Sequence, residues 1–347
     1  MTLTKEKLQS SDTTVRIATL IALPAVLKEL GYEPAMVLAE IGFDLSLFEN
    51  PENIISYAKR SQLIRHCVNQ TGCSHFGHLI GRHADTSSFG LVGLLMLQST
   101  DVATALRSLV RFAHLHVRGA VIYLEVVDDQ AFLGYSIIQP GVEAQEQIED
   151  GAVTIAFNIL RNLCGSKCHP SAILFAHRKP VNTHPFRQFF KATLGFDAER
   201  SGVLFPASCL QQPVMGANPE QRRLLQKQIE QLENSFRGDF AEQVRRVLHP
   251  ALLTHQASAD NIAALFSIQQ RTMHRRLKTC STNFQKLADE SRFEIARQLL
   301  KNSSIKLSQI AETLDYADAS AFTRAFRRWS GTIPSLWREQ YQHELTV

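Results

Sequence analysis

The chain has 347 residues, and its 44% hydrophobic and 20% charged content argues against long disordered regions and allows two folded domains. Its net charge of +4 lies in the last quarter of the chain: from His255 onward there are 13 Lys and Arg against 9 Asp and Glu, and the first 254 residues hold 24 of each. This localised surplus points to an anionic partner for the C-terminal part.

The N-terminus lacks the apolar core of a signal peptide, and the longest apolar run, beginning at Ile17, is too short to span a bilayer. The six cysteines form no C-x-x-C pair. We therefore expect a cytoplasmic protein with reduced thiols. Cys164, Cys168 and His169, with Cys209, could in principle hold a metal, but buried thiols are the commoner outcome. We expect neither a metal nor a cofactor.

The first part of the chain alternates between helical and extended patterns. Asp101 is a good cap for a following helix, and Gly90 and Gly93 permit close approach of another backbone. Helices are predicted at 15–48 (two, broken at 31–34 and near 42), 58–71, 102–117, 146–163 and 184–195, and strands within 120–138 (a hairpin), 171–177 and 202–206. We infer a mixed α+β domain over residues 1–215.

A polar helix is predicted over residues 216–236, opened by Asn218 as its cap and by a proline in its first turn. Its apolar residues recur at spacings of four, three and four: Leu225, Ile229, Leu232 and Phe236. Two explanations of this stripe remain open: packing on its own domain, or self-association into a homodimer. Because a coiled coil of two heptads is only marginally stable alone, the first needs no further support and the second does. As the linker, this helix is also the natural element for transmitting a signal between the two parts.

From residue 237 onward the pattern is entirely helical, with one helix expected to end around Pro250 and a long helix over 283–300. On either side of the long helix an internal repeat recurs 48 to 49 residues apart. It pairs Ile262-Ala263 with Ile310-Ala311, and Met273 and Leu277 with Phe322 and Phe326. Two helix-turn-helix units joined by a long helix account for it. The alanine in each pair suits a close helix crossing.

Each second helix carries cationic side chains opposite its apolar stripe. Arginine pairs bidentately with guanine in the major groove, whereas other cations fix position on phosphates. The expected base contacts are Arg271, His274, Arg275, Ser320 and Arg324, with a phosphate contact left open for His274. The expected phosphate contacts are Arg276, Lys278, Lys286, Arg327 and Arg328.

Residues 237–341 resemble the DNA-binding domain of AraC/XylS-type transcription regulators. The resemblance rests on the segments NIAALFSIQQRTMHRRLK, SRFEIARQLL and QIAETLDYADASAFTRAFRRWSGTIPSLWR. It implies two units inserting into successive major grooves of double-stranded DNA, and contact with RNA polymerase. The chain departs from the family pattern at Gln269, Ser281, Asp315 and Ala319, which affects the turns, and alanines 319 and 321 leave a small reading face on the second unit.

The N-terminal part is similar to the long effector-sensing, arabinose-binding-like half found in a subgroup of these regulators. The segments that carry this likeness are LKELGYEPAMVLAEIGFD, FGLVGLLMLQSTDVATALRSLVRF and GFDAERSGVLFPASCLQQPV. The resemblance implies binding of a small-molecule effector, whose contacts no motif fixes, and dimerisation. The prediction is an activator controlled by such an effector. The alternatives are a regulator without an effector, or an enzyme domain fused to a DNA anchor, although the common catalytic motifs are absent.

Overall fold

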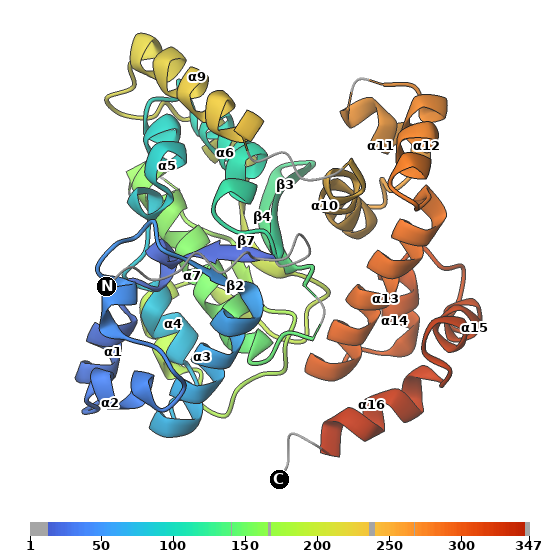
Figure 1. The fold of residues 1–347 in the computed structure, drawn as a ribbon, viewed down its shortest axis with the longest axis horizontal. Helices are drawn as coiled ribbons and strands as arrows, with labels where there is room; N and C mark the ends of the chain where they lie inside the picture. The colour runs from blue at the N-terminus through green and yellow to red at the C-terminus, as the bar shows by residue number, and fades with distance from the viewer. Residues whose placement is uncertain (1–12, 140, 166–167, 236–239, 267, 344–347) are drawn as a thin grey trace.

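A computed structural model describes residues 13–343, except residues 140, 166–167, 236–239 and 267. Figure 1 shows two parts side by side, a mixed part from the N-terminus to α9 (Pro219–Ser235) and a helical part from α10 (Phe240–Leu253) onward. The expected fold class is thereby confirmed: a mixed N-terminal half and an all-helical C-terminal half. Within the described part of the chain, no helix is long and apolar enough to cross a membrane.

The N-terminal layer is built from short helices around a small two-stranded sheet. Its elements are β1 (Thr14–Arg16), η1 (Ile17–Leu20), α1 (Leu23–Glu29), α2 (Pro34–Ala39), η2 (Leu45–Phe48), β2 (Ile54–Ser56), α3 (Tyr57–Thr71) and α4 (Phe76–Gly81). The predicted break before Pro34 is correct, and this proline begins α2. The pairing of β1 with β2 was missed, because strands of three residues show no usable alternation.

The main sheet has five strands in the order β3-β4-β7-β5-β6, antiparallel except for β5 with β6. Its strands and the helices around it are η3 (Thr86–Phe89), α5 (Gly90–Leu97), α6 (Val102–Phe112), β3 (Ala120–Val127), β4 (Gln130–Ile137), α7 (Gln145–Cys164), β5 (Ala172–Leu174), α8 (His184–Phe190), β6 (Thr193–Gly195) and β7 (Ser201–Pro206). The hairpin at β3 and β4 is confirmed. The helix predicted over 184–195 ends early, at Phe190, because the next residue, Lys191, has φ 50°, and β6 follows.

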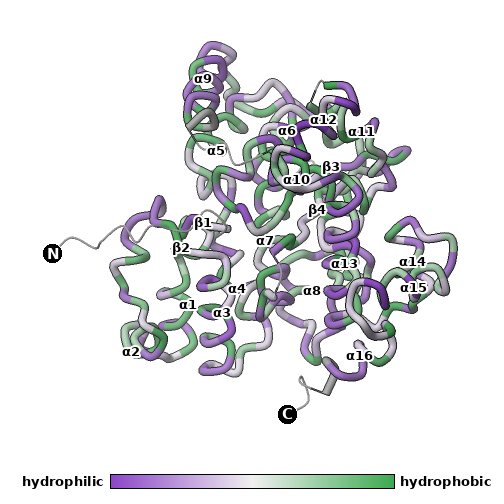
Figure 2. Tube along the Cα trace, turned by 45° about the vertical axis from the view of Figure 1, so that its right-hand side comes forward, coloured by the Kyte–Doolittle hydropathy of each residue, from purple (hydrophilic) through white to green (hydrophobic). Residues whose placement is uncertain are grey.

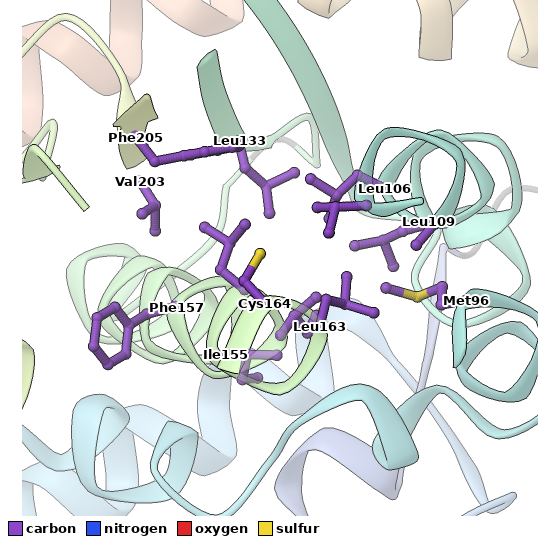
Figure 3. Packing of buried hydrophobic residues seen from close by; sticks show 14 of the residues in the cluster. Met96, Leu106, Leu109, Leu133, Ile155, Phe157, Leu163, Cys164, Val203 and Phe205 are labelled. Carbon is purple, nitrogen blue, oxygen red and sulfur yellow. The ribbon is translucent and has the colours of Figure 1, made fainter. Parts of the chain in front are cut away.

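One face of this sheet and helices α5, α6 and α7 enclose the main core of the N-terminal half. Figure 3 shows Leu133 of β4 and Phe205 of β7 opposite Leu106 of α6 and Leu163 of α7. The close approach expected at Gly93 is present, because a Cβ there would lie 1.9 Å from the Thr86 carbonyl oxygen. The fold therefore needs glycine at this position.

The cysteine prediction is wrong at one pair. Cys168 and Cys209 form a disulfide across 41 residues, with a Cα–Cα distance of 5.7 Å. Cys168 precedes β5, Cys209 follows β7, and β5 pairs with β7, so the sheet brings the two thiols together. Cys164 stays a free, buried thiol.

Helix α9 packs on the N-terminal half through part of its predicted stripe. Ile229 is fully buried in the main core and Leu225 is partly buried against it, whereas Leu232 is 37% exposed. Arg222 anchors the same helix by donating to the Leu95 carbonyl at 3.2 Å. The fourth stripe residue, Phe236, lies outside the described residues. Figure 2 shows the remainder of α9 as largely hydrophilic.

The C-terminal half consists of α10, α11 (Ala259–Leu265), α12 (Gln270–Thr279), α13 (Phe284–Asn302), α14 (Leu307–Thr313), α15 (Ala319–Ser330) and α16 (Pro334–His343). Helix α10 covers the predicted stretch FAEQVRRVLHPALL and ends at Leu253, three residues after Pro250. Proline lacks only its own N–H, and its carbonyl still accepts from the Thr254 N–H at 3.0 Å.

The second face of the sheet packs directly against the helical half. Tyr123 and Phe132, on β3 and β4, belong to the same buried cluster as residues of α10 such as Val244 and Leu248. Gly134 makes room for this contact, because a Cβ there would lie 2.3 Å from Cζ of Tyr123. Hydrogen bonds also join the halves, among them Arg178 N–H to Asn302 O (2.8 Å), Gln298 Nε2 to Ile137 O (2.7 Å) and Ser304 N–H to Asp197 Oδ1 (2.6 Å).

Candidate nucleic-acid interface

The first helix-turn-helix unit consists of α11 and α12. Ser258 caps α11 by accepting from the Asn261 N–H at 3.1 Å, as expected. Ala263 is 1% exposed where the helices meet, so a larger side chain would separate them. Met273 and Leu277 are fully buried and fix the inner face of α12. Its outer face exposes Arg271, His274, Arg275, Arg276 and Lys278 to solvent.

The second unit, α14 and α15, repeats this arrangement. Asp318 caps α15 by accepting from the Ala321 N–H at 2.7 Å. Phe322 and Phe326 are fully buried, and Ala311 is buried at the helix crossing. The exposed side chains of α15 are Ser320, Arg324, Arg327 and Arg328. The structure thus places every predicted base-contact residue on the solvent side of a helix whose other side is locked in the core.

Helical spacing places Phe322, Phe326 and Trp329 on one apolar stripe of α15, but the structure does not bury the third of them fully. Trp329 is only partly buried, and its indole nitrogen has no hydrogen-bond partner among the described residues. Trp337 of α16 completes the core instead, with its ring 6.1 Å from that of Phe326. A helix that turns back across the unit is therefore part of its support.

Three of the predicted phosphate contacts have protein neighbours. Arg328 forms an ion pair with Asp289 at 3.2 Å, so contact with a phosphate would exchange one anion for another. The Arg276 guanidinium lies 5.4 Å from the centroid of the Phe240 ring. Lys286 is in the first turn of α13, where its N–H donates to the Asn283 side chain at 2.9 Å, and its own side chain is exposed. Asp289 and the Phe240 ring thus hold two of these cations, Arg328 and Arg276, at the surface.

Two departures from the expected turn residues keep the turn conformation. Ser281, after α12, has φ 56°, and Asp315, after α14, has φ 61°. Both lie in the left-handed region, where glycine is unstrained and other residues are not. Asp315 gains a hydrogen bond with His255, itself at φ 56°. The substitutions therefore alter the strain in the turns and leave their geometry intact.

Ser281→Gly will stabilise the C-terminal half by about 1 kcal/mol, because the exposed serine makes the left-handed conformation costly. Gly331→Ala is the opposite substitution and serves as the control. Gly331 follows α15 at φ 78°, so alanine there should lower the stability of the C-terminal half by a similar amount. Urea denaturation of both variants measures the two shifts. A destabilised Ser281→Gly would show that the serine side chain contributes a contact of its own.

The N-terminal half contains a cavity that could not be located from the sequence. It is bounded by β1, α3, β3, β4 and α7, and three of the polar residues that line it are Arg60, His116 and Tyr135. A signal was available, because Arg60 has the same helical spacing as the buried Leu63, Ile64 and Cys67 on α3. A charged residue in a buried stripe is rare unless it is paired, so it indicates a cavity or a partner.

The described residues hold no group of three or more His, Cys, Asp or Glu that could bind a metal ion. The paired helix-turn-helix units, with cationic outer faces and a mixed domain attached, define a DNA-binding transcription regulator. Residues 31–214 match the family model of the arabinose-binding N-terminal domain of AraC transcription regulators, and residues 262–340 match a helix-turn-helix domain. The chain belongs to the AraC family of transcription regulators.

The similarity to two other transcription regulators covers nearly the whole of both chains. The ornithine utilization regulator of Pseudomonas aeruginosa is 24% identical over 92% of this chain and 93% of its own. The regulator VirS of Mycobacterium tuberculosis is 23% identical over 93% and 96%. Among solved structures, the transcriptional regulator CdpR from P. aeruginosa aligns over 93% of this chain and 98% of its own, at 20% identity and a TM-score of 0.44.

Proposed function

We propose that this protein is an effector-controlled, sequence-specific activator of transcription that inserts α12 and α15 into successive major grooves. Arg271, His274 and Arg275 read bases from the first helix, and Ser320 and Arg324 from the second. The phosphate contacts come from five further cationic side chains: Arg276, Lys278, Lys286, Arg327 and Arg328. The division is sensing domain 1–215, linker 216–236 and DNA-binding domain 237–347.

The observation that carries this proposal is the two-sided construction of α12 and α15. On each helix the residues at the helix crossing are buried and the arginines are exposed, although the helices come from units 48 residues apart. An ordinary solvated face has no reason to recur in this way. Arginine on an exposed face beside a fixed helix crossing is suited to bidentate contact with guanine.

The finer roles rest on relatives and on packing. The activator CsvR of Escherichia coli is 32% identical over 108 residues, which supports activation. Contact with RNA polymerase is proposed from the family resemblance alone. Homodimer formation is supported by Leu224, which is 62% exposed on α9, and by Leu232, which is 37% exposed on the same helix. We propose that these two leucines lie in the interface between two copies of the chain.

The route from effector to DNA runs through the sheet as well as the linker. Helix α9 rests on α5, in the sensing half, whereas β4 contacts the helical half directly. The Ile137 carbonyl of β4 accepts from Gln298 of α13, which joins the two units. A shift of β4 would therefore change how α12 and α15 are held. An effector that favours one position of β4 would shift the equilibrium between two arrangements of the DNA-binding half.

Arg275→Ala will weaken binding to the preferred DNA site by roughly 1–3 kcal/mol, or about 5- to 150-fold, and relax base preference at one position. Selection from random DNA followed by titration of wild type and variant measures both effects. Arg327→Ala, on the phosphate-facing side, should weaken all sequences alike and reduce the salt dependence. Arg223→Ala, exposed on α9, is the neutral control. Uniform weakening by Arg275→Ala would make it a phosphate contact.

A further inference from the structure

The cavity of the sensing half is enclosed mainly by apolar side chains. Leu109 of α6, Leu133 of β4, and Ile155 and Ile159 of α7 form much of its wall. The cavity volume is about 50 Å³, and the cavity opens to solvent at its mouth. Its lining has the composition of small-molecule sites, which are mostly apolar with a few placed polar groups.

Two arginines line this wall, Arg16 and Arg60, and among the described residues Arg60 is the one without an ion-pair partner. Its side chain is on the buried face of α3, and the residue is only 6% exposed. Its Nε has no hydrogen-bond partner, and within the described part of the chain no carboxylate forms an ion pair with it. Its neighbours are the ring of Tyr57, 5.3 Å from the guanidinium, and Tyr135. A buried guanidinium surrounded by neutral groups is costly unless an anion joins it.

The tyrosines beside Arg60 do not supply that anion. Their hydroxyl groups are 3.0 Å apart and hydrogen-bond to each other. Burial, followed by the neighbouring Tyr135, raises the pKa of Tyr57 well above its usual value, so this phenol stays neutral. The Tyr57 phenol therefore does not balance the charge of Arg60.

His116 supplies a second unpartnered polar atom in the same cavity. The residue is 6% exposed and its Nδ1 has no hydrogen-bond partner. Burial, and then the charge of Arg16, lowers the pKa of His116 to about 4, so the imidazole is neutral near pH 7. It can share a hydrogen bond with a ligand without adding charge. Arg16 already has an ion-pair partner in Glu52.

The lining also determines which ligands do not fit. Among the described residues around the cavity, none is Asp or Glu. An amino acid such as ornithine would bury its ammonium groups without a counterion, which is costly. A sugar would leave several hydroxyl groups against Leu and Ile side chains with too few partners. One arginine without an ion-pair partner and an apolar wall match a ligand with one negative charge and an apolar body.

We propose that this cavity binds a monocarboxylate with an aliphatic body, its carboxylate held by Arg60 and His116 and its chain packed between α6, β4 and α7. The proposal rests on the effector control proposed above and names the chemical class of that effector. Nothing covalent occurs, and the ligand binds by ion pairing, hydrogen bonding and burial of its chain.

Tyr135 connects this site to the DNA-binding half. It lines the cavity on one side and, with Ser136, a second cavity between the halves whose wall includes His249 of α10 and Gln298 of α13. A carboxylate on Arg60 competes with the Tyr135 hydroxyl for the guanidinium. Its arrival therefore moves the end of β4 that Gln298 holds.

The test uses the full-length protein and octanoate as the probe, with calorimetric titration. Octanoate should bind, while octan-1-ol, arabinose and ornithine bind at least tenfold more weakly or not at all. Arg60→Met should lower octanoate affinity at least tenfold and leave the ligand-free protein at least as stable as wild type, because an unpaired buried charge is removed. Arg65→Met, on the exposed side of α3, should bind octanoate like wild type.

A second variant keeps the test decisive if Arg60→Met fails to fold. Ala156→Phe narrows the cavity and leaves Arg60 in place, so it should also abolish octanoate binding. Equal binding of octanoate and octan-1-ol, or of octanoate to wild type and Arg60→Met, would overturn the carboxylate assignment. Octanoate binding without any change in DNA affinity would overturn effector control and keep the ligand class. If arabinose or ornithine changes DNA affinity and octanoate does not, effector control is kept and the assigned ligand class is overturned.

Discussion

Asp150→Ala will destabilise the protein by about 3–5 kcal/mol, because it leaves His177 buried without its anion. The His177 Nε2 lies 2.9 Å from the Asp150 carboxylate, and its Nδ1 lies 2.9 Å from the Arg178 carbonyl oxygen. Both ring nitrogens thus have acceptors, which suits a doubly protonated imidazole. Burial opposes that charge, but the carboxylate outweighs it and raises the pKa of His177 to about 9.

The same pair gives the stability of the wild type a pH dependence. The pKa of His177 is higher in the folded state than its ordinary value of 6.5, so the folded state binds its proton more tightly than the unfolded state. The resulting stabilisation is fully present below pH 6.5 and is lost as pH rises through about 9. From 1.36 kcal/mol per pKa unit it is on the order of 3 kcal/mol. In Asp150→Ala this fall between pH 6.5 and 9 should largely disappear.

Urea denaturation at pH 6, 7.5 and 9 measures the effect, with Glu33→Ala as the control. Glu33 is exposed and its side chain makes no capping hydrogen bond to α2, so its removal should change little at any pH. If Asp150→Ala keeps the full wild-type pH dependence, His177 is not the titrating group. The pair matters for function because Arg178, the next residue, bonds to Asn302 of the DNA-binding half.

The features that the sequence predicted correctly are those with local causes. The caps at Asp101, Ser258 and Asn218 depend on residues three positions away or fewer, and each accepts the expected backbone N–H. The buried stripes of α12 and α15 follow from helical spacing alone. Local rules were therefore enough to identify the two units and the sides they expose.

The contacts that were missed depend on segments far apart in the chain. No local pattern indicates that Gly134 accommodates Tyr123 so that the sheet meets α10. The Cys168–Cys209 bond likewise needs the strand order. Arg60 is the exception, since its place in the buried stripe of α3 was visible in the sequence. A charge at a core position indicates a cavity or a partner, and only the fold shows which.

Phe326→Ala will destabilise the DNA-binding half by about 3–5 kcal/mol and abolish DNA binding where that half is unfolded. Phe326 is fully buried, with ring centroids of Phe293, Phe322 and Trp337 between 5.5 and 6.1 Å away. Leu336→Ala is the matched control, because Leu336 is 54% exposed on α16 and its truncation opens no cavity.

The measurement can resolve the two halves, because both tryptophans of the chain, Trp329 and Trp337, lie in the DNA-binding half. Tryptophan fluorescence therefore follows that half alone, while far-UV circular dichroism follows the whole chain. In Phe326→Ala the fluorescence midpoint should fall well below the final dichroism transition, with the sensing half still folded. If both probes shift together, the shared cluster of Tyr123 and Phe132 with α10 makes the chain one cooperative unit. A boundary near residue 237 would then separate functions without separating folding units, and an effector in the sensing half would act on the stability of the whole chain.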